Sequence, residues 1–189
     1  PLTSIRMMTE MLHHNRVPEE RKPAYYQEML EESEHLSHLI DNILDFSRMD
    51  DERKKYDFAD LDLNELLLNF LESARERHTD PGFEIRFTTP DKVPLIKADK
   101  DAMLQVIYNL VDNAIKFSET SRQIDITLIS RDAELQLSVK DYGIGISVKD
   151  QEKIFDRFYR SDETQKMGIK GSGIGLTIVK KIVEAHKGR

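Results

Sequence analysis

The sequence predicts an α+β protein in which a helical hairpin precedes a two-layer α/β domain with a mixed sheet. Three observations support this prediction. Apolar residues recur at helical spacing through residues 1–51, strand-like and helical segments alternate from residue 56 onward, and a charged run at 50–55 separates the two patterns. We therefore expect a hairpin domain at 1–55 and a second domain at 56–189.

Composition restricts the class of protein. The net charge is −7 and the basic residues are scattered, so no nucleic-acid surface is expected. The absence of cysteine excludes disulfides and thiolate metal sites and fits a reducing compartment. No apolar run approaches the roughly 20 residues that a membrane-spanning helix needs. Because the chain starts at Pro1 rather than at methionine, we expect a fragment. We expect a cytoplasmic location, with any tether to the inner membrane in segments outside the fragment.

Apolar spacing predicts the hairpin. Residues 1–14 form the end of a helix, Pro18 breaks it, and a second helix runs from about Pro23 to about Asp51. The second helix carries a seam that repeats every seven residues, formed by Met29, Leu36 and Ile43 with Leu39 and Phe46 between them. Since two helices cannot bury this much apolar surface alone, two copies are expected to form a four-helix bundle. A hairpin packed on its own domain is the alternative.

The second domain is predicted element by element. Alternating apolar residues predict strands, at 56–61, 83–87, 94–98, 123–129 and 133–140. Apolar residues at three- and four-residue steps predict helices, at 63–78, 99–117 and 174–185. Asp62 or Asn64 is expected to cap the first of these helices. Strands mixed with helices favour one mixed sheet with helices on one face.

Two glycine-rich runs indicate a candidate site. Asp141-Tyr-Gly-Ile-Gly-Ile-Ser147 follows a predicted strand, and Gly171-Ser-Gly-Ile-Gly175 leads into the last predicted helix. Alternate glycines let a backbone approach a ligand closely, and glycines that open a helix favour an anion because free N–H groups point at it. Either run alone is more often a turn, and neither matches the common phosphate-loop motifs. Together they predict one nucleotide site, with Asp141 at the base and the second run at the phosphates.

A third element brings in a family resemblance. Asn109, Asn113 and Lys116 share one face of a predicted helix, where by themselves they would form a solvated polar stripe. The segments that carry the resemblance stand in a fixed order, at 109–118, 141–147, 154–160 and 171–180. They resemble the asparagine box, first glycine box, phenylalanine box and second glycine box of the sensor histidine kinases. The ATP-binding fold of that family is shared with gyrase, Hsp90 and MutL, and the resemblance covers nearly the whole chain.

The resemblance implies ATP and Mg²⁺ as cofactors and gives single residues a role. Asn113 would ligate Mg²⁺ with Asn109 beside it, and Lys116 would reach the phosphates. Asp141 would accept a hydrogen bond from the adenine amino group, although a turn-capping aspartate is the simpler alternative. Arg160 would contact the γ-phosphate through its planar fork, the alternative being a solvated arginine. The loops would contribute Gly143 and Gly145 at the base and Gly171, Ser172, Gly173 and Gly175 at the phosphates.

Two segments between the glycine runs are expected to support the site. Phe155 and Phe158 would form a small hydrophobic cluster that ties a loop down. Residues 161–170 are charged and poor in apolar side chains, and Gly168 and Gly171 flank their end. We therefore expect a mobile lid that becomes ordered over the nucleotide.

The activity implied by the resemblance is that of an ATP-dependent protein-histidine kinase. A homodimer would pass the γ-phosphoryl group to a histidine and then to an aspartate on a response-regulator receiver domain. The acceptor histidine would lie upstream of Pro1, and the last strands of the fold would lie beyond Arg189. The histidines present are expected to be ordinary surface or helix-end residues: His13, His14, His35, His38, His78 and His186. Alternatives are an ATPase or serine kinase of the same fold and an ATP-binding dimerising scaffold without kinase activity.

Overall fold

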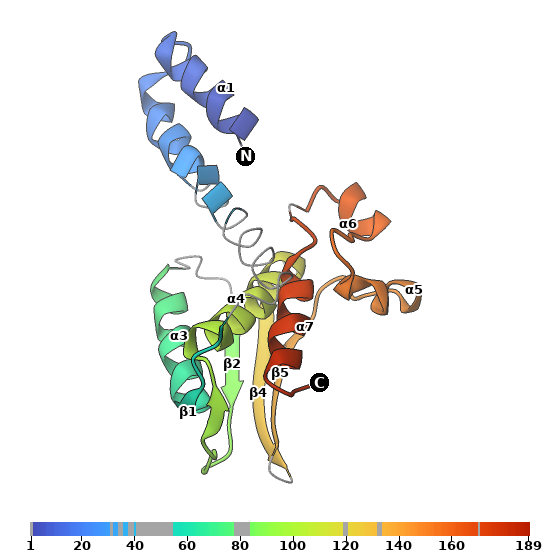
Figure 1. Ribbon diagram of the computed structural model, residues 1–189. Coiled ribbons are helices and arrows are strands. Elements are labelled where there is room, and N and C mark those ends of the chain that lie inside the picture. The colour runs from blue at the N-terminus through green and yellow to red at the C-terminus, as the bar shows by residue number, and fades with distance from the viewer. Residues whose placement is uncertain are drawn as a thin grey trace. The chain divides into compact units, whose positions relative to one another are not determined.

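The computed structural model describes residues 2–30, 32–33, 36–37, 40, 55–77, 84–118, 121–131, 134–169 and 171–189 (Figure 1). The chain divides into two compact units, Pro1–Arg53 and Lys54–Arg189. No helix among the described residues is both long enough and apolar enough to cross a membrane.

The N-terminal unit is a helical hairpin. Helix α1 spans Leu2–His13, the short helix η1 spans Glu19–Arg21, and residues 22–30 are again helical. Met8 of α1 is buried within this unit. The first helix and the break after it are confirmed, and so is the start of the second helix. The predicted seam residues Leu39, Ile43 and Phe46 lie outside the described residues.

The C-terminal unit contains the predicted mixed sheet. Strands β2 (Glu84–Thr88), β4 (Gln123–Arg131) and β5 (Glu134–Asp141) form a three-stranded sheet in the order β2-β4-β5. Strands β2 and β4 are parallel, whereas β4 and β5 are antiparallel. Strands β1 (Ala59–Leu61) and β3 (Ile96–Ala98) pair with each other in a separate antiparallel ladder, where the sequence had predicted one sheet.

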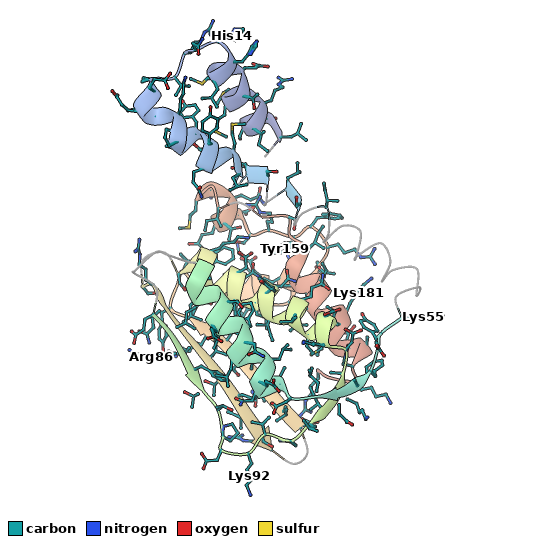
Figure 2. All side chains as sticks on the ribbon, turned by 90° about the vertical axis from the view of Figure 1, so that its left-hand side faces the viewer. His14, Lys55, Arg86, Lys92, Tyr159 and Lys181 are labelled. Atoms are coloured by element: carbon teal, nitrogen blue, oxygen red, sulfur yellow. The ribbon has the colours of Figure 1, made fainter. Side chains whose placement is uncertain are left out.

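Three helices cover one face of the three-stranded sheet (Figures 1 and 2). They are α3 (Leu63–Arg77), α4 (Lys100–Phe117) and α7 (Gly175–Ala185). Side chains alternate along β4, so Ile124, Ile126 and Leu128 are buried against the helices. Their partners in the core include Leu67 of α3 and Ile107 of α4. The two-layer architecture is therefore confirmed, and it leaves the opposite face of the sheet polar.

The long connection between β5 and α7 holds three short helices that the sequence did not predict. These are α5 (Val148–Gln151), η2 (Lys153–Phe155) and α6 (Asp162–Lys166). Each is too short to show a helical period in the sequence. Two long helices begin at aspartate caps. Of the two predicted candidates for α3, Asp62 is the cap, and it accepts from Asn64 N–H and Glu65 N–H at 2.9 and 3.0 Å. Asp99, for which the sequence predicted no capping role, caps α4.

His186 joins the start of α4 to the end of α7. The Asp99 N–H donates to His186 Nε2 at 3.0 Å, and His186 Nδ1 lies 2.8 Å from the Ile182 carbonyl oxygen. These contacts define the neutral tautomer with its proton on Nδ1. The rings of Tyr56 and Phe58 pack on the imidazole, with centroids 5.1 and 4.8 Å away. The sequence predicted an ordinary helix-end histidine; the residue is at a helix end, and it also fastens residues 56–58 to both helices.

We expect His186→Ala to lower the free energy of unfolding by about 1–3 kcal/mol, because the Asp99 N–H loses its acceptor and two aromatic rings lose their partner. Urea unfolding followed by circular dichroism measures this. Arg189→Ala is the matched control, since the Arg189–Glu134 ion pair is largely exposed and should contribute no measurable stability. An unchanged unfolding midpoint for His186→Ala would contradict the role of the imidazole.

Candidate functional site

The close approach of α4 to α7 forms the centre of the candidate site. Asn109 on α4 donates from Nδ2 to the Gln105 carbonyl at 2.8 Å, which fixes the orientation of its amide. A Cβ atom placed on Gly175, the first residue of α7, would lie 2.7 Å from Asn109 Oδ1. A side chain at this position would displace the Asn109 amide, and glycine avoids this where the N-terminus of α7 lies against the polar face of α4. The structure thus brings together one residue of the predicted asparagine box and one of the second glycine run.

The first glycine run lies against the C-terminal end of α4. Asp141 is the last residue of β5, and its Oδ1 accepts from Gly143 N–H at 3.0 Å. A Cβ atom on Gly143 would lie 1.8 Å from the Phe117 carbonyl oxygen, so a side chain at this position is excluded by backbone. Gly145 adopts φ 71°, which glycine tolerates readily. The loop that begins with Asp141 therefore packs against the C-terminal end of α4, the helix that carries Asn109.

The second glycine run interlocks with the phenylalanine segment. Phe158 has φ 60°, which is unusual for a bulky residue, and its N–H donates to the Gly173 carbonyl at 3.0 Å. A Cβ atom on Gly173 would lie 2.7 Å from both Phe158 C and Tyr159 O. Strained backbone of this kind persists where the surroundings determine it, and it concentrates at functional sites.

The predicted role of the two phenylalanines as a hydrophobic cluster is wrong. Phe158 is 66% exposed and Phe155 is 38% exposed. Polar contacts hold this segment in place: besides the Phe158–Gly173 bond, Thr177 Oγ1 of α7 donates to the Phe155 carbonyl at 3.0 Å. The Phe158 ring is thus mostly exposed, whereas the Phe155 ring is partly covered and lies 5.9 Å from Lys180 Nζ.

Asp150 connects the first glycine run to the phenylalanine segment. Its carboxylate, only 8% exposed as a residue, accepts from the Ser147 hydroxyl at 2.6 Å and from the Tyr159 hydroxyl at 2.7 Å. Figure 2 labels Tyr159. The Ser147 and Tyr159 hydroxyls hold the pKa of Asp150 below its usual range, and the same hydrogen bond raises the pKa of Tyr159 to about 12. The sequence analysis missed this cluster because its members are ordinary loop residues.

The predicted cationic residues contact protein groups in this structure. Lys116 Nζ lies 2.5 Å from Asp112 Oδ2, one turn back on α4. Arg160 Nη2 donates to the carbonyl oxygen of Ile169, near the start of the second glycine run. Asn113 is partly buried on α4. Arg160 thus ties the segment 161–169, which contains α6, back to the phenylalanine segment.

The remaining predicted residues lie in the second glycine run. Ser172 Oγ accepts from Ile174 N–H at 3.4 Å, and no atom lies within 4 Å of a Cβ placed on Gly171. Within the described ranges there is no group of three His, Cys, Asp or Glu side chains that could hold a metal ion. A metal at this site would therefore need ligands other than a carboxylate cluster.

Two family models match the chain. Residues 1–52 match the His Kinase A (phospho-acceptor) domain, and residues 98–189 match the histidine kinase-, DNA gyrase B- and HSP90-like ATPase. The sensor protein kinase WalK of Staphylococcus aureus (strain MRSA252) is 36% identical over 194 residues, which is all of this chain and 31% of WalK. The chain therefore spans about a third of the length of this curated relative.

Solved histidine kinases share the fold. The catalytic domain of ThkA is 30% identical, with a TM-score of 0.59, over 69% of this chain and 82% of that domain. ThkA in complex with the response regulator protein TrrA has a TM-score of 0.71 at 25% identity, over 98% of this chain and 52% of ThkA. Full-length ShkA in complex with AMPPNP has a TM-score of 0.71 at 27% identity, over 98% and 38% of the two chains.

We expect Gly143→Ala to lower the free energy of unfolding by about 1–3 kcal/mol, because a methyl group cannot share the position of the Phe117 carbonyl and the backbone must move. Urea unfolding measures the change. Gly171→Ala is the matched control in the other glycine run. No atom lies close to its Cβ position, so the free energy should stay level or rise by up to about 1 kcal/mol. Equal losses in both variants would contradict the contact with α4.

Acid should weaken the Asp150 cluster. Because the pKa of Asp150 is lower in the folded chain than in the unfolded chain, the carboxylate stabilises the fold above about pH 4, and this stabilisation is lost as the pH falls through the folded pKa. Asp150→Asn should therefore unfold more easily than wild type at pH 7, and the difference in the free energy of unfolding should shrink as the pH falls through the lowered pKa of Asp150. Urea unfolding across this range, with the exposed Asp156→Asn as control, measures the effect. A difference that grows on acidification would contradict it.

Proposed function

Since the chain belongs to the sensor histidine kinase family, we propose that it is the core that binds Mg-ATP and passes the γ-phosphoryl group to a histidine and then to a response-regulator aspartate. We propose residues 1–55 as the dimerisation hairpin and residues 56–189 as the ATP-binding domain. The observation that carries the proposal is the contact of Gly175 with Asn109, because it sets the start of α7 beside the polar face of α4. Backbone N–H groups at a helix N-terminus favour an anion such as a phosphate.

Adenine recognition is assigned to Asp141. Its Oδ1 accepts from Gly143 N–H, which orients the carboxylate and leaves Oδ2 to accept from the exocyclic amino group of the base. Gly143 and Gly145 would let the backbone pass the base without a side chain in the way. The AMPPNP complex of ShkA, an adenine nucleotide bound to a similar chain, supports this choice of ligand.

The donors on α4 suit Mg²⁺. Asn113 lies one turn beyond Asn109 on the same helix face, and its side chain offers a neutral amide oxygen. Mg²⁺ prefers oxygen ligands and keeps several waters, so it needs few protein ligands when phosphate oxygens complete the shell. Asn113 would therefore hold the ion, with Asn109 beside it. When bound, the ion neutralises phosphate charge.

The phosphates would contact the second glycine run and two cations. Gly171, Ser172, Gly173 and Gly175 would surround the phosphates at the start of α7. Lys116 and Arg160 would reach them by exchanging Asp112 and the Ile169 carbonyl, respectively, for phosphate oxygens. For Arg160 this exchange would release residues 161–169, which we propose as the lid over the nucleotide.

The transfer breaks the bond between the γ-phosphorus and its bridging oxygen, so ADP leaves. It forms a bond to the unprotonated nitrogen of a neutral imidazole, whose other ring nitrogen then releases its proton to solvent. Such transfer depends on positioning and charge neutralisation. We expect the acceptor histidine N-terminal to Pro1. The complex of ThkA with TrrA supports a receiver domain as the next acceptor. A cytoplasmic location follows from these partners, with any membrane segment outside residues 1–189.

A homodimer through the hairpin is supported by its exposed apolar side chains. They include Leu2 (65% exposed), Met7 (57%), Leu30 (55%) and Ile40 (48%). In one copy these side chains face solvent, whereas a second hairpin could cover them in a four-helix bundle. An ATP-binding scaffold without kinase activity, or an ATPase or serine kinase of the same fold, is less favoured because both family models match in the kinase order.

We expect ATP to bind this chain in the micromolar range in a calorimetric titration, more tightly with Mg²⁺ than without it. Asp141→Asn should weaken binding at least tenfold, because an amide nitrogen would face the adenine amino group. The exposed carboxylate variant Asp156→Asn is the control and should bind like wild type. A folded wild-type chain that binds no ATP would contradict the proposal and bring the scaffold alternative forward.

A further inference from the structure

Tyr142 has no part in the site described so far, although it stands between Asp141 and Gly143. The ladder between β4 and β5 ends at the pair Ile124–Asp141, so main-chain pairing does not reach Tyr142. Residues 142–149 beyond it are all exposed. Asp141 is therefore the last residue that the main-chain ladder holds, and a side chain that attaches Tyr142 to the sheet adds to the contacts that fix this strand end.

Alternation along β5 sends Tyr142 to the opposite side of the sheet from Asp141. Leu137 and Val139 pack against the core that α3 and α4 complete, and Asp141 follows them at the same parity. Lys140 and Tyr142 have the other parity, and Lys140 Nζ lies 4.5 Å from the centre of the Tyr142 ring. The two residues beside Asp141 thus lie together on the face that the helices leave open.

Tyr142 is attached to β4 on that open face. Its hydroxyl donates to Asp125 Oδ2 at 2.6 Å, while Gln123 Nε2 donates to Asp125 Oδ1 at 3.3 Å. In the register of the sheet Asp125 is opposite Lys140, whereas Tyr142 lies one step beyond the end of the ladder. The hydrogen bond is therefore a diagonal tie across the strand end, just past the residue that would recognise the base.

Two cations lie beside Asp125 on the open face. Arg86 on β2 and Lys140 on β5 are its neighbours in the sheet (Figure 2 labels Arg86). The hydrogen bonds from Tyr142 and Gln123, and then these cations, hold the pKa of Asp125 below its usual range. The Arg86 guanidinium is itself paired with Glu84, with Nε 2.8 Å from Glu84 Oε1, so Asp125 keeps its hydrogen bonds from Tyr142 and Gln123. At neutral pH the tie is a charge-assisted hydrogen bond.

We propose that Tyr142 and Asp125 are positioning residues, whose hydrogen bond on the open face of the sheet aims the Asp141 carboxylate at the adenine base on the other face. This inference rests on the proposed nucleotide site. Its consequence is selectivity for the base, since only the amino group of adenine, and not the phosphates, contacts Asp141. Guanine carries a carbonyl oxygen where adenine carries the amino group, so a well-aimed carboxylate repels it.

The test is the ratio of the dissociation constants for GDP and ADP, measured by calorimetry on the whole chain with Mg²⁺. Tyr142→Phe keeps the ring over Lys140 and removes only the hydroxyl. We expect it to lower the ratio about threefold to tenfold, as the loss of one hydrogen bond allows. Asp125→Ala should do the same, and Asp125→Asn, which keeps an accepting oxygen, should stay closer to wild type. The double variant Tyr142→Phe/Asp125→Ala should lower the ratio no further than either single variant, because all three variants lose the same Tyr142–Asp125 hydrogen bond.

Two matched control variants show whether the loss of any exposed tyrosine hydroxyl or aspartate carboxylate changes the ratio of the dissociation constants. Tyr26→Phe removes an exposed tyrosine hydroxyl in the hairpin, and Asp60→Ala removes an exposed strand carboxylate that pairs with Lys97. Both should leave the ratio at its wild-type value. A Tyr142→Phe chain whose ratio is unchanged, including one that binds both nucleotides equally more weakly, overturns the positioning role.

Asp141→Asn separates this failure from a failure of the proposed function. If Asp141→Asn collapses the ratio while Tyr142→Phe leaves it unchanged, the nucleotide site stands and only the positioning role is lost. If Asp141→Asn binds ADP and GDP like wild type, the assignment of the base to Asp141 is wrong, and the positioning role is overturned with it.

Discussion

The structure depends on how closely α4 and α7 approach each other at Gly175. A side chain on Gly175 would have to displace the Asn109 amide from its bond to the Gln105 carbonyl or push α7 away from α4. The two helices carry different parts of the candidate site: α4 holds the polar face with Asn113 and Lys116, and α7 begins where the second glycine run ends. The two parts of the proposed nucleotide site are therefore carried by two helices that approach each other closely at Gly175.

The loops of the site are attached to this pair of helices by backbone as much as by side chains. Gly143 lies under the last carbonyl of α4, and Gly173 lies against the backbone of Phe158 and Tyr159. Asp150 then joins the two loops through the hydroxyls of Ser147 and Tyr159. Such a continuous set of contacts gives a physical route by which a ligand at one loop could bias the other, and it accounts for glycines at 143 and 173 without reference to the ligand.

Much of the fold could be predicted because periodicity records which face of an element is buried. The alternation along β4 and the caps Asp62 and Asp99 each have a local signal, and so do the glycine runs. The residue pairs that hold the candidate site together, such as Tyr142 and Asp125, have no local signal in the sequence. Asp125 and Tyr142 are ordinary surface residues in the sequence and meet only through the register of β4 and β5. The exposure of Phe158 was missed for the same reason, since it follows from a backbone contact with Gly173.

The residues proposed to bind the nucleotide and the hairpin proposed to present the acceptor histidine lie in different units of the chain. Every residue assigned to the nucleotide lies in the unit Lys54–Arg189, whereas the hairpin that would present the acceptor histidine is in the other unit. Nucleotide binding can then be complete without transfer, and transfer additionally requires that the units meet. His186 fastens Tyr56 and Phe58 to the start of α4 and the end of α7, which are also the helices of the proposed site. A movement of the C-terminal unit would therefore carry Tyr56 and Phe58 with it, because they are attached to the same two helices that hold the proposed nucleotide site.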